Sequence, residues 1–157
     1  MIIDQQEEFT RDWDRYAVDE DGHVGHFTTA GLRALPKSVR QDREAAESLS
    51  RYFFEAAPVN GDFSIRPEAE TDCGGWKKQG RDTYLRDFAF MASKGLFSFN
   101  TEVSHAGASR YFLVAAPTSP LRLGDLPSSI QPVLSRTVAP LRFVDSAYIV
   151  STETESW

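Results

Sequence analysis

The chain has 157 residues, a formal net charge of -6, a hydrophobic fraction of 41%, an aromatic fraction of 12% and one cysteine. This composition excludes a disordered chain and a disulfide framework, and a net negative charge without a basic cluster disfavours nucleic-acid binding. The length is typical of one domain, so we expect residues 1–157 to fold as a single domain with its own core.

Residues 12–29 have the pattern of a β-hairpin. Tyr16 and Val18 indicate a first strand, and Val24 and Phe27 indicate a return strand. Between them, residues 19–22 contain two aspartates and a glycine, which are the residue types that a tight reversal requires. We therefore expect an antiparallel pair at the start of the sheet.

Two helices are predicted, one on either side of a long loop. Residues 38–56 begin with a Ser38–Gln41 capping box, and an apolar stripe that includes Leu49 and Phe53 follows at helical spacing. Residues 82–94 show a second helical stripe, and Gly95 stands where a left-handed C-cap belongs.

The loop between the helices, residues 58–80, is longer than a simple connection requires. Phe63 and Ile65 are apolar side chains that a fully solvated loop does not need, so we expect this part to dock on the domain. Gly74 and Gly75 then form the tip, and Trp76 is the expected anchor for any binding partner, with Lys77 at the rim.

The C-terminal half is rich in predicted strands. Residues 96–100 form a short strand, and the apolar run 111–116 is typical of a central strand covered on both faces. A helical turn is expected at 130–134, followed by a last strand or bent pair within 141–149. Together these elements predict an α+β fold, with a mainly antiparallel sheet of about five or six strands packed by two principal helices.

No catalytic or metal-binding motif is found. Asp19 and Asp21 resemble part of a calcium loop, but the remaining EF-hand ligand positions hold the wrong residues, so a hairpin turn is favoured. His23 and His26 are three apart on a strand, which places their side chains on opposite faces, and we expect one on the solvent side and the other at the sheet edge. Cys73 has an acidic, flexible neighbourhood that does not activate a thiol. We therefore predict no catalytic residues, no metal and no cofactor.

The acid-rich N-terminal quarter is the main candidate for binding. Either it is an ordinary solvated surface, or it is a patch complementary to a basic partner. The predicted binding residues are Asp12, Asp14, Asp19, Asp21, Trp76 and Lys77.

Three segments resemble small bacterial proteins of unknown function, some of which are similar to toxin-immunity proteins. The segments are residues 12–29, residues 91–99, and residues 114–117 taken with 120–127. Their shared residues are hydrophobic and turn residues, so the resemblance implies a fold and a binding role and brings no active site with it.

These observations support two hypotheses. The first is a non-enzymatic cytoplasmic protein, immunity-like, that binds a basic protein partner through an acidic surface and contacts neither nucleic acid nor membrane. The alternative is a small-ligand-binding protein or an enzyme with a pocket beside residues 58–80, drawing on Asp72, Cys73, His105 and Tyr111. The N-terminus lacks a signal-peptide pattern, and no apolar run approaches the roughly 18 residues of a membrane span.

Overall fold

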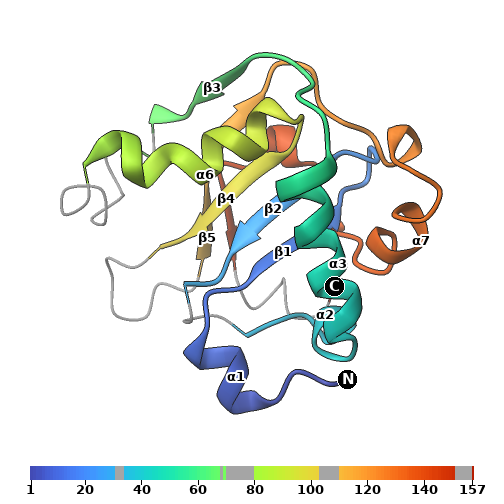
Figure 1. Ribbon diagram of the computed structural model, residues 1–157. Coiled ribbons are helices and arrows are strands. Elements are labelled where there is room, and N and C mark those ends of the chain that lie inside the picture. The colour runs from blue at the N-terminus through green and yellow to red at the C-terminus, as the bar shows by residue number, and fades with distance from the viewer. Residues whose placement is uncertain (31–33, 68, 70–79, 103–109, 151–156) are drawn as a thin grey trace.

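The computed structural model describes residues 1–30, 34–67, 69, 80–102, 110–150 and 157. It confirms the α+β class: a six-stranded, mostly antiparallel sheet is covered by helices (Figure 1). None of the helices in these ranges is long and apolar enough to span a membrane.

The sheet has the order β1-β2-β4-β5-β3, and β6 also pairs with β5. The strands are β1 (Asp14–Val18), β2 (Val24–Thr28), β3 (Phe63–Ile65), β4 (Phe97–Thr101), β5 (Arg110–Pro117) and β6 (Tyr148–Val150). Only the β2–β4 pair is parallel, with Gly25 opposite Phe97 and His26 opposite Ser98. The long apolar run is β5, which pairs with three strands, as a central strand should.

The predicted hairpin is confirmed. β1 and β2 pair antiparallel with Val18 opposite Val24. The reversal closes at Asp19 and Gly22, whose backbone N–H groups donate to His23 and Asp19 carbonyls respectively, and Gly22 has a φ of 78°. Glycine adopts this left-handed conformation without the steric cost of a side chain.

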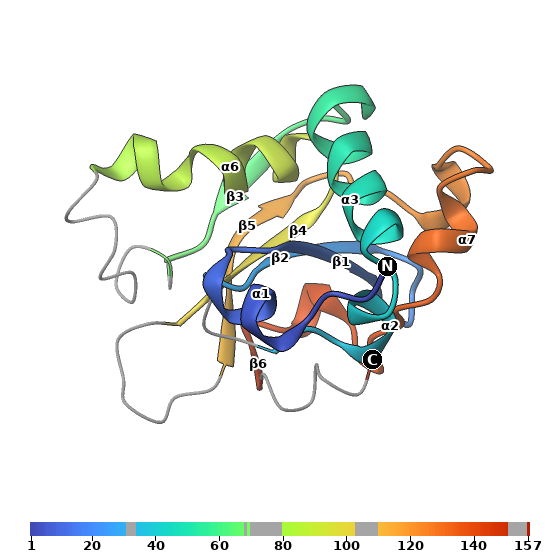
Figure 2. The same cartoon turned by 60° about the horizontal axis from the view of Figure 1, so that its bottom comes forward.

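Among the described residues there are five α-helices, more than the two principal ones expected. They are α1 (Gln5–Thr10), α2 (Lys37–Arg40), α3 (Arg43–Arg51), α6 (Arg81–Ser93) and α7 (Gln131–Leu134), with a π-helix η1 (Tyr52–Ala56) and 3-10 turns η2 (Leu123–Asp125) and η3 (Phe143–Asp145). The two longest, α3 and α6, cover the same face of the sheet (Figure 2).

The expected single helix over residues 38–56 is wrong in two respects. First, it breaks at Asp42, whose side chain caps α3 by accepting the Ala45 N–H at 3.0 Å. Second, Ser38 does not form the predicted capping box, because its hydroxyl contacts the Thr137 hydroxyl at 2.7 Å and donates to the Trp157 carbonyl. A long-range contact thus replaced a local one.

The second predicted helix corresponds to α6, with its apolar residues buried at Leu85, Phe88, Met91 and Ala92. Gly95 follows it with a φ of 95°. A Cβ at this position would lie 2.8 Å from the Leu121 Cβ, so the glycine is required by both conformation and space.

The docking of the long loop is confirmed for its first part. β3 lies inside residues 58–80 and pairs with β5, with Phe63 opposite Pro117 and Ile65 opposite Ala115. Gly74, Gly75, Trp76 and Lys77 lie outside the described residues. The last predicted strand is shorter than expected, since the chain forms η3 at Phe143–Asp145 before entering β6.

The two faces of the sheet have separate cores. On the helix-covered face, Tyr16, Val18 and Val24 pack with side chains from α3, η1 and α6, including Phe53 and Met91. The opposite face is lined by buried aromatic side chains from β2, β4, β5, η3 and the C-terminal end of the chain: Phe27, Phe97, Phe99, Tyr111, Phe143 and Trp157.

Arg15 lies among these aromatic rings. Its guanidinium carbon is 4.5 Å from the Phe27 ring centroid, and the residue is 1% exposed. Such a desolvated cation–π contact contributes about 2 kcal/mol, whereas removing a charge from water costs several kcal/mol. The rings therefore offset only part of the cost of burying this cation.

Candidate functional site

The four aspartates predicted to bind a partner lie in two groups at opposite ends of the hairpin. Asp12 and Asp14 stand at the start of β1, and Asp19 and Asp21 form the turn after it. Asp14 and Asp19 are five residue steps apart along extended chain, which is about 16 Å at the usual rise per residue. The acid-rich segment is thus not one patch.

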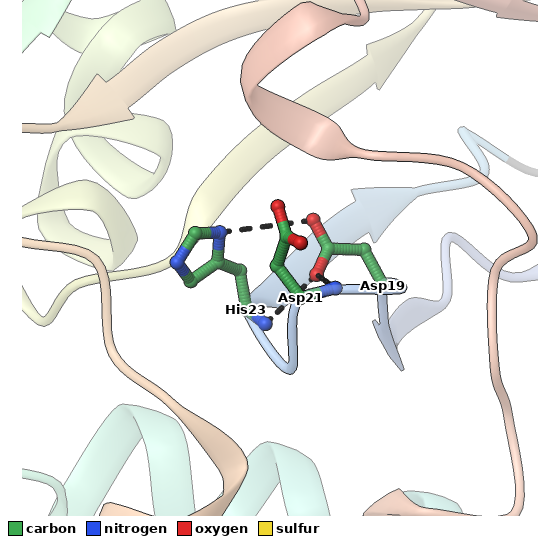
Figure 3. A group of neighbouring side chains, drawn as sticks. All are labelled: Asp19, Asp21 and His23. Carbon is green, nitrogen blue, oxygen red and sulfur yellow. Dashed lines mark hydrogen bonds and ion pairs between the residues drawn. The ribbon is translucent and has the colours of Figure 1, made fainter.

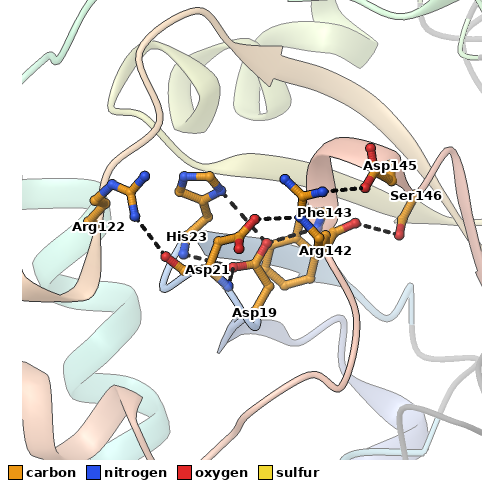
Figure 4. Close-up of polar contacts among 8 residues, drawn as sticks. All are labelled: Asp19, Asp21, His23, Arg122, Arg142, Phe143, Asp145 and Ser146. Atoms are coloured by element: carbon orange, nitrogen blue, oxygen red, sulfur yellow. Dashed lines mark hydrogen bonds and ion pairs between the residues drawn. The ribbon is translucent and has the colours of Figure 1, made fainter.

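The turn group is centred on Asp19, which is 3% exposed. One carboxylate oxygen accepts backbone N–H groups from Asp21 at 3.0 Å and His23 at 2.8 Å. The other accepts the Phe143 N–H at 2.8 Å, which ties the turn to η3 (Figure 4). Asp19 therefore holds together two segments that are far apart in the sequence.

Asp21 is hydrogen-bonded to two arginines, one through its side chain and one through its backbone. Its carboxylate accepts from Arg142 at 2.6 Å, and Arg122 donates to its backbone carbonyl at 2.9 Å (Figure 4). The Arg142 hydrogen bond holds the pKa of Asp21 below its ordinary value, and the same pair raises the pKa of Arg142. Arg142 also contacts Asp145 at 3.1 Å.

Ligand atoms of Asp19, Asp21 and His23 all lie within 4.8 Å of one another, which is close enough to surround a metal ion (Figure 3). Their hydrogen bonds argue for a structural role instead. The oxygens of Asp19 already accept three N–H groups, and the Asp21 carboxylate is ion-paired with Arg142. A cation would compete with these donors and would be repelled by the guanidinium.

The two histidines have different environments. His23 faces the Phe97 ring at 5.8 Å on the aromatic face, whereas His26 contacts Tyr16 and Phe88 on the helix-covered face. The opposite orientation follows from strand geometry. The expectation that one would face solvent is wrong, because His26 is fully buried and the His23 side chain is only 12% exposed.

The other end of the hairpin contains a continuous Asp14–His26–Ser98 hydrogen-bonded chain. His26 Nε2 lies 2.7 Å from an Asp14 carboxylate oxygen, and His26 Nδ1 lies 2.7 Å from the Ser98 hydroxyl. An ionised carboxylate only accepts, so Nε2 carries the hydrogen. The parallel pairing of β2 with β4 places His26 beside Ser98.

Asp14, His26 and Ser98 are the residue types of a serine-hydrolase triad, but the serine is buried and the aspartate is partly exposed, which is the reverse of what a hydrolase requires. Ser98 and His26 are both fully buried, and the Asp14 side chain is 33% exposed. A nucleophilic serine has to reach its substrate. Here only the Asp14 carboxylate reaches the surface, so the two hydrogen bonds of His26 orient Asp14 and do not activate Ser98.

Asp12 lies next to this exposed end. Its carboxylate accepts the Ala30 N–H at 2.6 Å. Partial desolvation raises its pKa, the Asp14 carboxylate raises it further, and the Ala30 hydrogen bond and His26 act against this shift. Ala30 has a φ of 52°, a left-handed conformation that costs a non-glycine residue free energy and is often found at functional sites.

Asp12 and Asp14 both line each of two grooves. The α3 groove, about 350 Å³, is bordered by Trp13, Ser50 and Phe54. The second, the α6 groove, has a volume of about 360 Å³. Both volumes lie at the lower end of the range for ligand sites.

The α6 groove is lined by Thr28, Tyr84 and Asn100 as well as the two aspartates. These three side chains are hydrogen-bonded in series: the Thr28 hydroxyl donates to Asn100 at 2.7 Å, and Asn100 donates to the Tyr84 hydroxyl at 2.6 Å. The groove wall is therefore polar and fixed in position.

Most other acids of the N-terminal quarter have partners. Asp4 caps α1, Glu7 pairs with Arg43, Glu8 lies 3.6 Å from Arg40 and accepts the Leu35 N–H, and Asp19 and Asp21 are engaged in the turn. By contrast, neither Asp12 nor Asp14 has an arginine or lysine partner within the described residues. They differ from exposed Glu20, which also has no cationic partner among the described residues, because they line the two grooves.

No family model, curated protein or solved structure matches this chain. The functional assignment rests on its own residues.

Four of the six predicted binding residues are placed by the structure, and Trp76 and Lys77 lie outside the described residues. The sequence analysis did not find Ser98, Tyr84 or Asn100. Each lies more than fifty residues from Asp14, and no local motif connects them with it. Strand pairing places Ser98 and Asn100, and the packing of α6 on β4 places Tyr84.

Proposed function

We propose that this chain is a non-enzymatic, cytoplasmic binding protein that recognises a basic protein partner through Asp12 and Asp14. One observation carries the proposal: the two carboxylates line both grooves with no cationic side chain paired to them in the described part of the chain. A partner's arginine or lysine would supply the missing charge.

The surroundings suit an arginine. Guanidinium groups bind carboxylates through paired hydrogen bonds and stack on aromatic rings. Phe54 borders the α3 groove and Tyr84 borders the α6 groove, whereas the Trp13 ring is already covered by Arg11 at 4.2 Å. Asp14 is preoriented by His26, so little side-chain entropy is lost when a partner binds.

The overall charge supports the same kind of partner. At a formal net charge of -6, the chain attracts basic proteins over several ångströms and accelerates their association at low salt. The resemblance of residues 12–29 to immunity-like proteins favours a basic toxin, such as a nuclease, as the partner class.

The test is a titration with an acetylated, amidated tri-arginine peptide, followed by amide chemical shifts. We expect shifts at Asp12, Asp14, Ala30 and Tyr84, and an affinity that falls as salt is added. The double variant Asp12→Asn/Asp14→Asn should lose at least tenfold in affinity.

The matched control is Glu20→Gln/Asp62→Asn. It removes the same net charge from two exposed residues outside both grooves. Equal weakening in the two double variants would mean that only net charge matters, and the proposed site would be wrong.

The alternative is a small-ligand-binding protein or an enzyme. The α6 groove favours it, because α6 directly follows residues 58–80 and the groove has a polar, fixed wall. Tyr111 does not belong to this site: it is fully buried on the aromatic face. Asp72, Cys73 and His105 lie outside the described residues.

A fluorophosphonate probe separates the two functions. We expect no covalent labelling of Ser98, because it is fully buried. Labelling that disappears in Ser98→Ala would establish a nucleophilic serine and favour the enzyme.

A further inference from the structure

Arg15 lies on the aromatic face of the sheet, opposite the grooves, and its guanidinium lacks hydrogen-bond partners in the described part of the chain. The residue is 1% exposed, and Nε, Nη1 and Nη2 are all buried without a partner among the described residues. An arginine side chain keeps its charge in proteins and offers five N–H donors. All five donors are thus unsatisfied here.

The same small region contains two more unsatisfied polar groups. The guanidinium carbon lies 5.1 Å from the Tyr111 ring centroid and 5.6 Å from the Trp157 ring centroid. The Tyr111 hydroxyl and the Trp157 indole nitrogen are buried, again without partners in the described ranges. Arginine and indole only donate, and the Tyr111 hydroxyl is the one group of the three that can also accept, so donors outnumber acceptors in this cluster.

The protein satisfies its other buried cation. Lys94 is 4% exposed, and its ammonium donates to the Phe53 and Phe54 carbonyls while lying 4.0 Å from the Phe90 ring centroid. Lys94 thus contacts both an aromatic ring and two hydrogen-bond acceptors. Within the described residues, Arg15 contacts aromatic rings alone. Buried polar groups are rarely left unpaired in folded proteins, and an exception indicates an acceptor that is still to be identified.

We propose that Arg15 anchors a buried site for a small carboxylate anion, with the Tyr111 hydroxyl and the Trp157 indole N–H as additional donors. A carboxylate is planar and matches the guanidinium fork with two parallel hydrogen bonds. Its single negative charge neutralises the single positive charge of Arg15. A phosphate dianion would leave an uncompensated charge among Phe27 and the other rings, which favours the carboxylate.

Trp157 forms the accessible side of this site. It is 8% exposed, and the Ser38 hydroxyl donates to its carbonyl at 3.1 Å. Its indole N–H is one of the proposed donors to the anion. The indole N–H resonance of Trp157 is therefore a direct reporter of occupancy.

The test is thermal unfolding of the full chain in sodium acetate, with ionic strength held constant by sodium chloride. With an affinity of about 5 mM, roughly 50 mM acetate should raise the Tm by about 4 °C, because the anion binds only the folded state. Sodium phosphate at the same concentration should have a smaller effect. The Trp157 indole resonance should move with the same midpoint.

Arg15→Met should abolish the response to acetate. Tyr111→Phe removes only a hydroxyl, so it should fold and weaken the response, and it keeps the test decisive if Arg15→Met fails to fold. The control Arg122→Met removes a charge elsewhere and should retain the full response, because Arg122 contacts the hairpin turn.

Three results would overturn the proposal. The first is an acetate response that is unchanged in Tyr111→Phe and Arg15→Met. The second is no response in the wild type or in any variant. The third is a response that occurs only in Glu153→Gln or Glu155→Gln, which would show that a carboxylate of the chain itself occupies the site. A wild-type response that persists in both glutamine variants supports a free anion.

Discussion

The two ends of the β1–β2 hairpin contain the same residue types but use them differently. At the turn, Asp19 is buried and accepts three backbone N–H groups, and Asp21 is paired with Arg142. At the other end, Asp12 accepts the Ala30 N–H, Asp14 is hydrogen-bonded to His26, and both border open grooves. A carboxylate surrounded by donors holds the fold together, while one with unused acceptor capacity is available to a partner.

The largest predicted difference between the two ends is in stability. Asp19→Ala leaves the buried Phe143 N–H and two part-buried N–H groups without an acceptor, and we expect the free energy of unfolding to fall by about 3–5 kcal/mol. Urea unfolding monitored by circular dichroism measures this. If Asp19→Ala costs no more than Asp12→Ala, the contrast between the two ends is wrong.

The second prediction concerns the support of Asp14. His26→Ala removes a fully buried ring and both of its hydrogen bonds, and should cost about 2–4 kcal/mol. Ser98→Ala removes only the hydroxyl and should cost about 1 kcal/mol, which makes it the matched control. Both variants should also weaken binding of the arginine peptide if Asp14 needs His26 for its orientation, and unchanged binding would show that it does not.

A smaller effect is expected at Asp21, whose pairing with Arg142 is exposed. Because its folded-state pKa is lowered from 3.8, ionised Asp21 stabilises the fold above that pH, and the stabilisation disappears as the pH falls through the folded-state pKa. Asp21→Asn should lower the Tm at neutral pH, with convergence to the wild type in acid. High salt should also reduce the difference, and a salt-independent difference would argue against an ion-pair origin.

The smallest predicted effect on stability is at Asp12, and its pH dependence has the opposite sign to that at Asp21. The pKa of Asp12 is raised above 3.8, so the folded state binds the proton more tightly than the unfolded state, and stability falls as the pH rises through this interval. Asp12→Asn keeps an acceptor for Ala30 and should slightly raise the Tm at neutral pH, with no difference well below the ordinary pKa. A variant that is more stable but binds the peptide less well is the behaviour expected of a binding residue. A lower Tm at neutral pH would instead make Asp12 structural.

The sequence alone determined the local elements. Alternating apolar residues and turn chemistry predicted the hairpin, the period of α6 predicted its buried face, and Gly95 marked its end, because each of these depends on neighbours within a few residues. The continuous apolar run likewise identified β5 as a central strand.

Tertiary structure decided which of these residues act together. The sequence does not distinguish Asp19 from Asp12, because the difference arises from Phe143 and His26, which reach them through packing. Ser98 lies beside His26 only because β2 pairs with β4 in parallel, and Arg15 loses contact with water only when strands and the C-terminal Trp157 close over it. Burial and long-range hydrogen bonds set the role of a charged side chain, and neither exists before the chain has folded.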